Sequence, residues 1–145
     1  MYRRILVPTD GTERSTNALE AALQLALLGH GTVIGVHASP PPYVMAPELG
    51  LAAPIHEAWR REREQLGLDA VAYIRRRADE AGVPCETLLV PGMAPCDAII
   101  RSAREQLCDL IVMASRGRGG LAGRLMGSET WKVLSRSAVP VLVLR

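Results

Sequence analysis

Short runs rich in Val, Ile and Leu alternate along the chain with segments whose apolar residues recur every three or four positions. We expect strands at residues 4–8, 32–38, 84–90, 110–114 and 139–144. Helices are expected at about residues 13–28, 54–81, 95–106 and 128–137. Strands that alternate with helices form a doubly wound parallel sheet with right-handed crossovers. The pattern therefore predicts an α/β fold in one domain, residues 1–145.

The expected helices have recognisable ends and inward faces. Thr12 precedes the first helix and can cap it, and Gly82 follows the long helix as a terminator. The side chains expected to pack inward are Trp59, Leu66, Tyr73, Ile74 and Ala78 in the long helix, and Trp131, Val133 and Leu134 in the last.

Composition excludes several classes of protein. Hydrophobic residues make up 48% of the chain, which excludes a disordered protein, and no apolar run approaches a membrane span. The first residues enter a strand too quickly for a signal peptide. Cys85, Cys96 and Cys108 are odd in number and lack C-x-x-C spacing. We therefore expect a cytoplasmic protein with reduced thiols, no metal site and no membrane contact.

Charge is distributed unevenly along the chain. The total is +2, but residues 111–145 hold six basic residues against the single acid Glu129, a net +5, so residues 1–110 carry −3. A basic last quarter favours binding of a small anion, although a solvated basic face is the simpler interpretation. Neither the total charge nor the few aromatic residues favour a nucleic-acid partner.

Polar and small residues follow four of the expected strands. Asp10 follows the first, His37 and Ala38 end the second, Pro91-Gly92 follow the third, and residues 114–117 follow the fourth. Ligands of doubly wound sheets bind at the carboxyl ends of the strands, beside the point where the strand order reverses. These positions therefore predict one binding site.

The fourth strand leads into a loop rich in glycine and arginine, which closes on Gly127-Ser128 before the last helix. Glycines let backbone N–H groups approach an anion, and a helix N-terminus adds unpaired donors. The loop lacks the lysine and the spacing of a Walker A motif. A partial dinucleotide pattern, Gly117-x-Gly119-x-x-Ala122, follows the wrong strand and has no acidic ribose-binding residue after it.

One pattern does fit this loop: G-x-x-G-x(9)-G-S, which here reads Ala114-Ser-Arg-Gly117, nine residues, then Gly127-Ser128. That pattern resembles the nucleotide signature of the universal stress protein family. The opening I-L-V-P-T-D-G-T at residues 5–12 and the closing P-V-L-V-L-R at residues 140–145 also resemble motifs of that family. The similarity extends over the whole chain.

The resemblance implies a three-layer, Rossmann-like sandwich with a five-stranded parallel sheet, of the adenine nucleotide α-hydrolase-like kind. It implies a homodimer through the last strand, residues 139–144, whose apolar edge would be exposed in a monomer unless other elements of the chain cover it. It also implies a regulatory module that binds ATP, normally with Mg²⁺, and hydrolyses it slowly or not at all.

The resemblance further implies roles for individual residues. Asp10 would accept a hydrogen bond from the adenine or ribose, and Ala38 would lie against the adenine through its backbone. Met113 and Ala114 would border the ribose. The N–H of Gly117 and the start of the last helix would hold the phosphates. The full set of expected ligand residues is Pro8, Thr9, Asp10, Ala38, Met113, Ala114, Arg116, Gly117, Arg118, Gly127, Ser128, Glu129 and Thr130.

Several alternatives remain open from the residues alone. Ala114 replaces the first glycine of the signature; it costs little at negative φ, is strained at positive φ, and its methyl could crowd the ribose. A chain that lost the ligand would act through protein–protein contacts. Asp10 has the simpler role of an Asx-turn, and Arg116 and Arg118 that of solvated residues. His37 is interpreted as a pocket-wall or hydrogen-bonded residue rather than a base.

Catalysis finds little support in the sequence. No Ser/His/Asp or Cys/His set is evident, and residues 8–15 lack the S-G-G-x-D-S loop of related ATP pyrophosphatases. A receiver domain would need a second acid beside Asp10, an aspartate directly after the third strand and a lysine after the last strand, none of which is present. A weak ATPase, or a protein that phosphorylates itself at a residue such as Ser128, is the remaining catalytic alternative.

Overall fold

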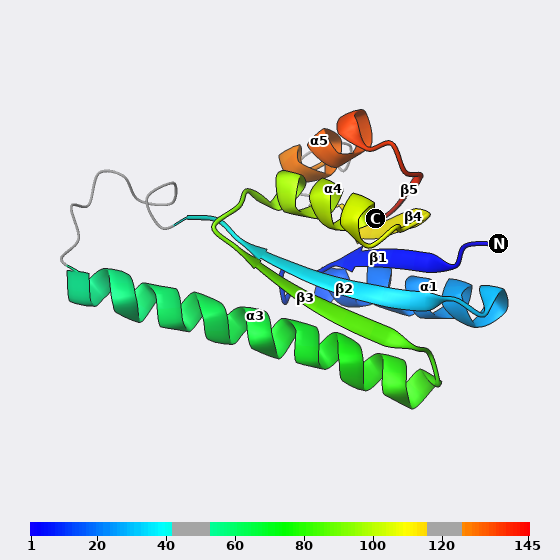
Figure 1. The fold of residues 1–145 in the computed structure, drawn as a ribbon, viewed down its shortest axis with the longest axis horizontal. Helices are drawn as coiled ribbons and strands as arrows, with labels where there is room; N and C mark the ends of the chain where they lie inside the picture. Colours follow the sequence, from blue (N-terminus) through cyan, green and yellow to red (C-terminus); the bar gives the residue numbers. More distant parts are fainter. Residues whose placement is uncertain (42–52, 116–125) are drawn as a thin grey trace.

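A computed structural model describes residues 1–41, 53–115 and 126–145. Its sheet has five strands in the order β3-β2-β1-β4-β5, and every neighbouring pair is parallel (Figure 1). The strands are β1 Arg4–Pro8, β2 Thr32–Ser39, β3 Cys85–Pro91, β4 Leu110–Ala114 and β5 Val141–Leu144. The helices are α1 Glu13–Gly29, α3 Ala53–Ala81, α4 Pro95–Glu105 and α5 Ser128–Arg136. The expected α/β, Rossmann-like fold is confirmed.

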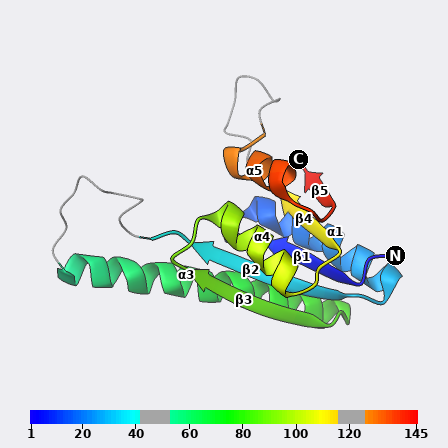
Figure 2. The same ribbon diagram turned by 45° about the horizontal axis from the view of Figure 1, so that its top comes forward.

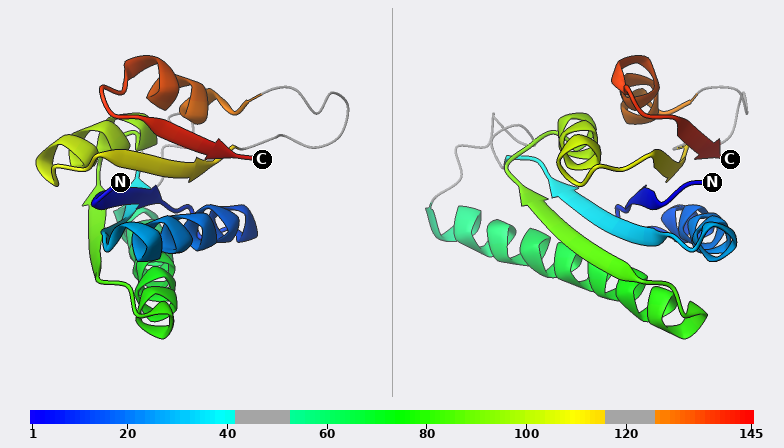
Figure 3. Two further views of the ribbon diagram at one scale, coloured as in Figure 1. Left: turned by 90° about the vertical axis from the view of Figure 1, so that its right-hand side faces the viewer. Right: turned by 45° about the vertical axis from the view of Figure 1, so that its right-hand side comes forward.

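The sheet is the middle of three layers. Helices α1 and α3 cover one face, and α4 and α5 cover the other (Figures 2 and 3). Alternate residues of β1 point into the two cores: Ile5 and Val7 pack with α1 and α3, whereas Leu6 packs with α4 and α5. All three side chains are fully buried, which explains the continuous apolar run of the central strand.

The strand order reverses between β1 and β4. The chain moves outward from β1 through β2 to β3, then returns to place β4 on the other side of β1. The helices that follow these two strands lie on opposite faces of the sheet, so the carboxyl ends of β1 and β4 border an opening. This is where the sequence predicted a binding site.

Two inward-facing side chains were predicted wrongly. The first half of α3 extends past the carboxyl ends of the strands (Figure 1). Leu66 is 51% exposed because it flanks the inward face of the later half, where its neighbour Gly67 is buried. Trp131 is 64% exposed, and the inward positions of α5 are held by Thr130 and Val133. Helical periodicity identifies an apolar face but does not show which of two neighbouring residues lies at its centre.

Two element boundaries also follow local contacts. Gly82 has φ +69° and ends α3 as expected, with the Val83 N–H donating to the Ala78 carbonyl at 2.9 Å. The last strand begins two residues later than expected because Val139 is held in a local turn. Its N–H donates to Ser137 Oγ at 3.0 Å, and that hydroxyl donates to the Val139 carbonyl at 2.7 Å.

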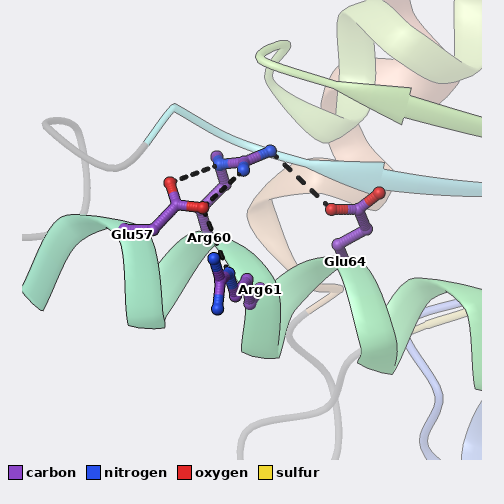
Figure 4. Close-up of polar contacts among 4 residues, drawn as sticks. All are labelled: Glu57, Arg60, Arg61 and Glu64. Atoms are coloured by element: carbon purple, nitrogen blue, oxygen red, sulfur yellow. Dashed lines mark hydrogen bonds and ion pairs between the residues drawn. The ribbon is translucent and has the colours of Figure 1, made fainter. Parts of the chain in front are cut away.

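The projecting half of α3 is held by ion pairs along the helix (Figure 4). Arg60 binds Glu57 through two hydrogen bonds of 3.0 and 2.7 Å, and Arg61 Nε adds a third at 3.1 Å. Arg60 Nη1 also lies 3.8 Å from a carboxylate oxygen of Glu64. These pairs support a helix that has no core beneath it. Among the described residues, no helix is both long enough and apolar enough to cross a membrane.

The pKa of the Glu57 carboxyl reports whether the ion pairs of α3 form. Hydrogen bonds from Arg60 and Arg61 lower the pKa of the Glu57 carboxyl from 4.5 to about 2. Because the folded-state pKa is depressed, this contribution to stability is complete above pH 4.5 and is lost as pH falls through about 2. We expect NMR titration of the Glu57 carboxyl carbon to give a pKa of about 2, and Arg60→Gln to raise it. An ordinary pKa in the unmodified protein would contradict the pairing.

Candidate functional site

The turn that follows β1 is ordered by its own side chains. The Thr9 N–H donates to the Val36 carbonyl at 2.9 Å, and Thr9 Oγ1 accepts from the Gly11 N–H at 3.1 Å. Asp10 Oδ1 accepts from both the N–H and the hydroxyl of Thr12, at 3.0 and 2.6 Å. Gly11 has φ +78°, which glycine adopts without strain. Asp10 therefore makes the Asx-turn that its sequence position allowed, and the Thr12 hydroxyl serves that turn instead of capping α1.

The buried hydroxyl of Ser15 holds the Thr9 side chain. Ser15 Oγ donates to the Thr12 carbonyl at 2.6 Å, so the hydrogen bond of 3.1 Å between the Ser15 and Thr9 hydroxyls must be donated by Thr9. The ring of His37 contacts the backbone of Thr9, with Nδ1 2.9 Å from the Thr9 carbonyl oxygen. The residue before Asp10 is therefore held through its backbone and its side chain.

The ends of β2 and β4 border the same opening. Ala38 lies near the end of β2, and Ala114 is the last residue of β4, paired with Leu144. Among the described residues, only His30 and Leu107 are non-glycine residues with positive φ, so Ala114 is unstrained at the position of the signature glycine. The Met113 side chain is buried in the core beneath α4 and α5, which leaves its backbone for any ligand contact.

Helix α5 begins at this edge with no capping side chain among the described residues. Gly127 occupies the N-cap, and its carbonyl accepts the first helical hydrogen bond from the Trp131 N–H at 3.0 Å. The N–H groups of Ser128, Glu129 and Thr130 belong to the first turn, where the helix offers no acceptor. Thr130 is buried and Ser128 is exposed, so the hydroxyl of Ser128 is the accessible one. Such a helix start attracts anions.

The carboxylate of Glu129 contacts a neighbouring helix. Its Oε2 accepts from the Cys96 N–H in the first turn of α4 at 2.8 Å, and its Oε1 accepts from Lys132 Nζ at 2.8 Å. An ion pair of 2.9 Å between Arg136 and Asp97 joins the same two helices. Glu129 therefore caps α4, whose own N-cap residue makes no side-chain cap, and only its backbone N–H remains to face an anion.

The remaining expected ligand residues divide into two groups. Pro8 ends β1 directly before the ordered turn. Arg116, Gly117 and Arg118 lie outside the described residues.

Sequence reasoning missed Ser15, for which no motif gave a signal. It also missed Gly67, although a glycine inside a helical pattern often marks close packing.

Nucleophilic and metal chemistry have few candidates in the described ranges. The three cysteines are unpaired, and burial raises the pKa of each thiol, that of Cys108 to about 11. All three are therefore protonated at neutral pH. No group of three His, Cys, Asp or Glu side chains within residues 1–41, 53–115 and 126–145 is placed to hold a metal ion.

Comparison with known proteins gives a consistent result. A model of the universal stress protein family matches residues 1–145. The universal stress protein YxiE of Bacillus subtilis is 34% identical over 149 residues, with complete coverage of both chains. The solved structure of MJ0577, a universal stress protein of Methanocaldococcus jannaschii, is similar with a TM-score of 0.82 at 26% identity, over 99% of this chain and 96% of that one. A universal stress protein solved in complex with cAMP gives a TM-score of 0.69 at 29% identity, over 99% and 97%.

The cap that Glu129 provides to α4 can be tested by truncation. We expect Glu129→Ala to lower the free energy of unfolding by about 1 kcal/mol, the usual cost of losing a helix cap. The matched control is Glu105→Ala on α4, which removes only an exposed pair with Arg101 and costs about 0.3–0.5 kcal/mol. Urea denaturation measures both. Equal effects of the two substitutions would show that Glu129 is an ordinary surface acid.

Proposed function

Since the chain belongs to the universal stress protein family, we propose that it binds ATP, together with Mg²⁺, at the carboxyl edge of its sheet. The observation that carries the proposal is the meeting of two unlike surfaces at one opening. One is the ordered turn after β1, and the other is the uncapped start of α5. A base and sugar need the first, and phosphates need the second. The relative solved with cAMP supports an adenine nucleotide as the ligand.

The proposed nucleotide would lie across the reversal point of the sheet. Its adenine and ribose would contact the turn of Pro8, Thr9 and Asp10, the backbone of Ala38, and the end of β4 at Met113 and Ala114. Its phosphates would contact the first turn of α5 through the final signature residues. The proposed phosphate contacts are the backbone of Gly127, Glu129 and Thr130, the hydroxyl of Ser128, and, outside the described residues, Arg116, Gly117 and Arg118.

The described residues favour binding over turnover. Glu129 is occupied by α4 and Lys132, and His37 Nδ1 is occupied by the Thr9 carbonyl. The Glu129 carboxylate would have to break these contacts to act as a general base, and the Cδ2–Nε2 edge of the His37 ring lies against Gly67 of α3. In the absence of a cluster of protein ligands within the described ranges, Mg²⁺ would be held mainly by the phosphates and by water. We therefore propose a regulatory nucleotide-binding protein of the stress response, with slow hydrolysis or none.

Calorimetric titration with Mg-ATP tests the ligand. We expect saturable binding in the micromolar range, about −8 kcal/mol. Ser128→Ala should weaken it roughly tenfold, because the Ser128 hydroxyl would donate to a charged phosphate oxygen. Ser135→Ala, in the last turn of the same helix, is the matched control and should bind as the unmodified protein does.

Two other outcomes would redirect the proposal. A protein free of co-purified nucleotide that gives no heat with ATP would indicate that the chain acts through protein–protein contacts. Phosphate release over time that disappears in Ser128→Ala would indicate the weak ATPase or self-phosphorylating alternative.

We further propose that two copies pair through β5. This strand is at the edge of the sheet, and Leu142 is 38% exposed. The carbonyls of Pro140 and Leu144 face β4 and accept from the N–H groups of Ile111 and, directly after β4, Ser115, at 2.9 and 2.8 Å. Because backbone groups alternate along a strand, the peptide groups of Val141 and Val143 point away from β4. Such an edge can pair with a second copy by two-fold symmetry.

The unpaired cysteines fit a reducing compartment, and the cytoplasm is the proposed location.

Removal of one outward N–H tests the proposed dimer. We expect analytical ultracentrifugation to give a dimer for the unmodified protein and a monomer for Val143→Pro, since proline cannot donate to a partner strand. Val143→Ala keeps the N–H, is the matched control, and should remain dimeric. A monomeric unmodified protein, or a dimeric proline variant, would contradict pairing through this edge.

A further inference from the structure

The pairing of β1 with β2 ends at an imidazole ring. The Thr9 N–H donates to the Val36 carbonyl, so the Val36 peptide faces β1. Ala38, two residues later, has its peptide on the same side of the strand. In a continuing parallel ladder the Ala38 N–H would donate to the Thr9 carbonyl. His37 Nδ1 instead contacts that carbonyl oxygen at 2.9 Å.

The contact fixes the protonation of the ring at one nitrogen. A carbonyl oxygen can only accept, so the short contact requires a hydrogen on His37 Nδ1. Both the charged imidazole and the neutral tautomer protonated at Nδ1 meet this requirement. The neutral tautomer protonated at Nε2 does not. Measuring which ring nitrogen of His37 carries a hydrogen therefore tests whether this contact forms.

Helix α3 leaves space for the same ring. A Cβ atom on Gly67 would lie 2.7 Å from His37 Cδ2, closer than real Cβ contacts, and 3.0 Å from Leu89 Cδ2, closer than most of them. Glycine is a much weaker helix former than alanine, so its presence here needs a local reason. The imidazole is thus held between the Thr9 carbonyl on one side and the backbone of α3 on the other.

We infer that His37 is a positioning residue of the nucleotide site. By taking the Thr9 carbonyl, it ends the ladder after Thr9, orders the peptide that leads into Asp10, and leaves the Ala38 peptide facing the opening. An adenine ring has nitrogen atoms that can accept from such an N–H. The inference rests on the proposed function, because it assigns His37 a role in that site.

Three histidine variants separate a positioning role from a structural one. We expect His37→Ala to bind Mg-ATP roughly three- to tenfold more weakly, the effect of one hydrogen bond. Asparagine carries an amide nitrogen at the same number of bonds from Cα as Nδ1, so His37→Asn should stay within about twofold of the unmodified protein. The matched control is His30→Asn at the opposite edge of the sheet, where asparagine suits a φ of +50° and affinity should not change. Thermal unfolding of each variant identifies any that fail to fold.

A variant of α3 tests the same contact without altering the histidine. Gly67→Ala should weaken ATP binding when His37 is present and have little further effect in the His37→Ala background, because the ring that it displaces is gone. In parallel, ¹⁵N NMR of the unmodified protein should show His37 protonated at Nδ1. Additive effects of the two substitutions, or a ring protonated only at Nε2, would overturn the inference.

The inference and the proposed function fail in different ways. If the unmodified protein binds ATP and His37→Ala binds it equally well, the positioning role alone is overturned. If the unmodified protein binds no adenine nucleotide, both are overturned.

Discussion

The central position of β1 is the constraint on which the rest of the structure depends. A parallel strand with neighbours on both edges and helices on both faces is fully paired and fully buried until it ends. Where β1 ends, its next backbone groups lose their ladder partners and must find others. The N–H groups of Gly11 and Thr12 donate to the side chains of Thr9 and Asp10, and the Thr9 carbonyl contacts His37 of β2. The result is an ordered polar surface at the reversal point of the sheet.

The N-termini of α4 and α5 lie on the same face of the sheet, and their positive ends have different partners. The first turn of α4 receives an internal anion, the carboxylate of Glu129, which is itself paired with Lys132. The first turn of α5, on which Glu129 sits, has no capping side chain among the described residues. An acid that could have opposed an incoming phosphate is thereby directed into the neighbouring helix. Of these two helices, it is the start of α5 that stays available to an external anion.

The fold was predictable from the sequence to a greater degree than the contacts of the site. Buried strands and amphipathic helices follow from local periodicity, and the Asx-turn of Asp10 follows from residues two positions apart. Leu66 and Trp131 were misplaced because each lies beside a buried residue of its helix, and a periodic pattern does not show which of two neighbours faces inward. The bonds of Glu129 to Cys96 and of His37 to Thr9 join residues 33 and 28 positions apart, and no local rule predicts them. The unstrained φ of Ala114 likewise required the structure.

The most direct test of this account is a map of backbone amide NMR shifts on addition of Mg-ATP. We expect the largest changes in amide shift at Thr9 and Asp10, at Ala38, and at the start of α5. These groups are far apart in sequence and share only the carboxyl edge of the sheet. The opposite edge provides an internal reference, since a shallow depression there is lined by Ala26, His30 and Val83 among others. Shifts confined to that depression, or none at all, would contradict the account.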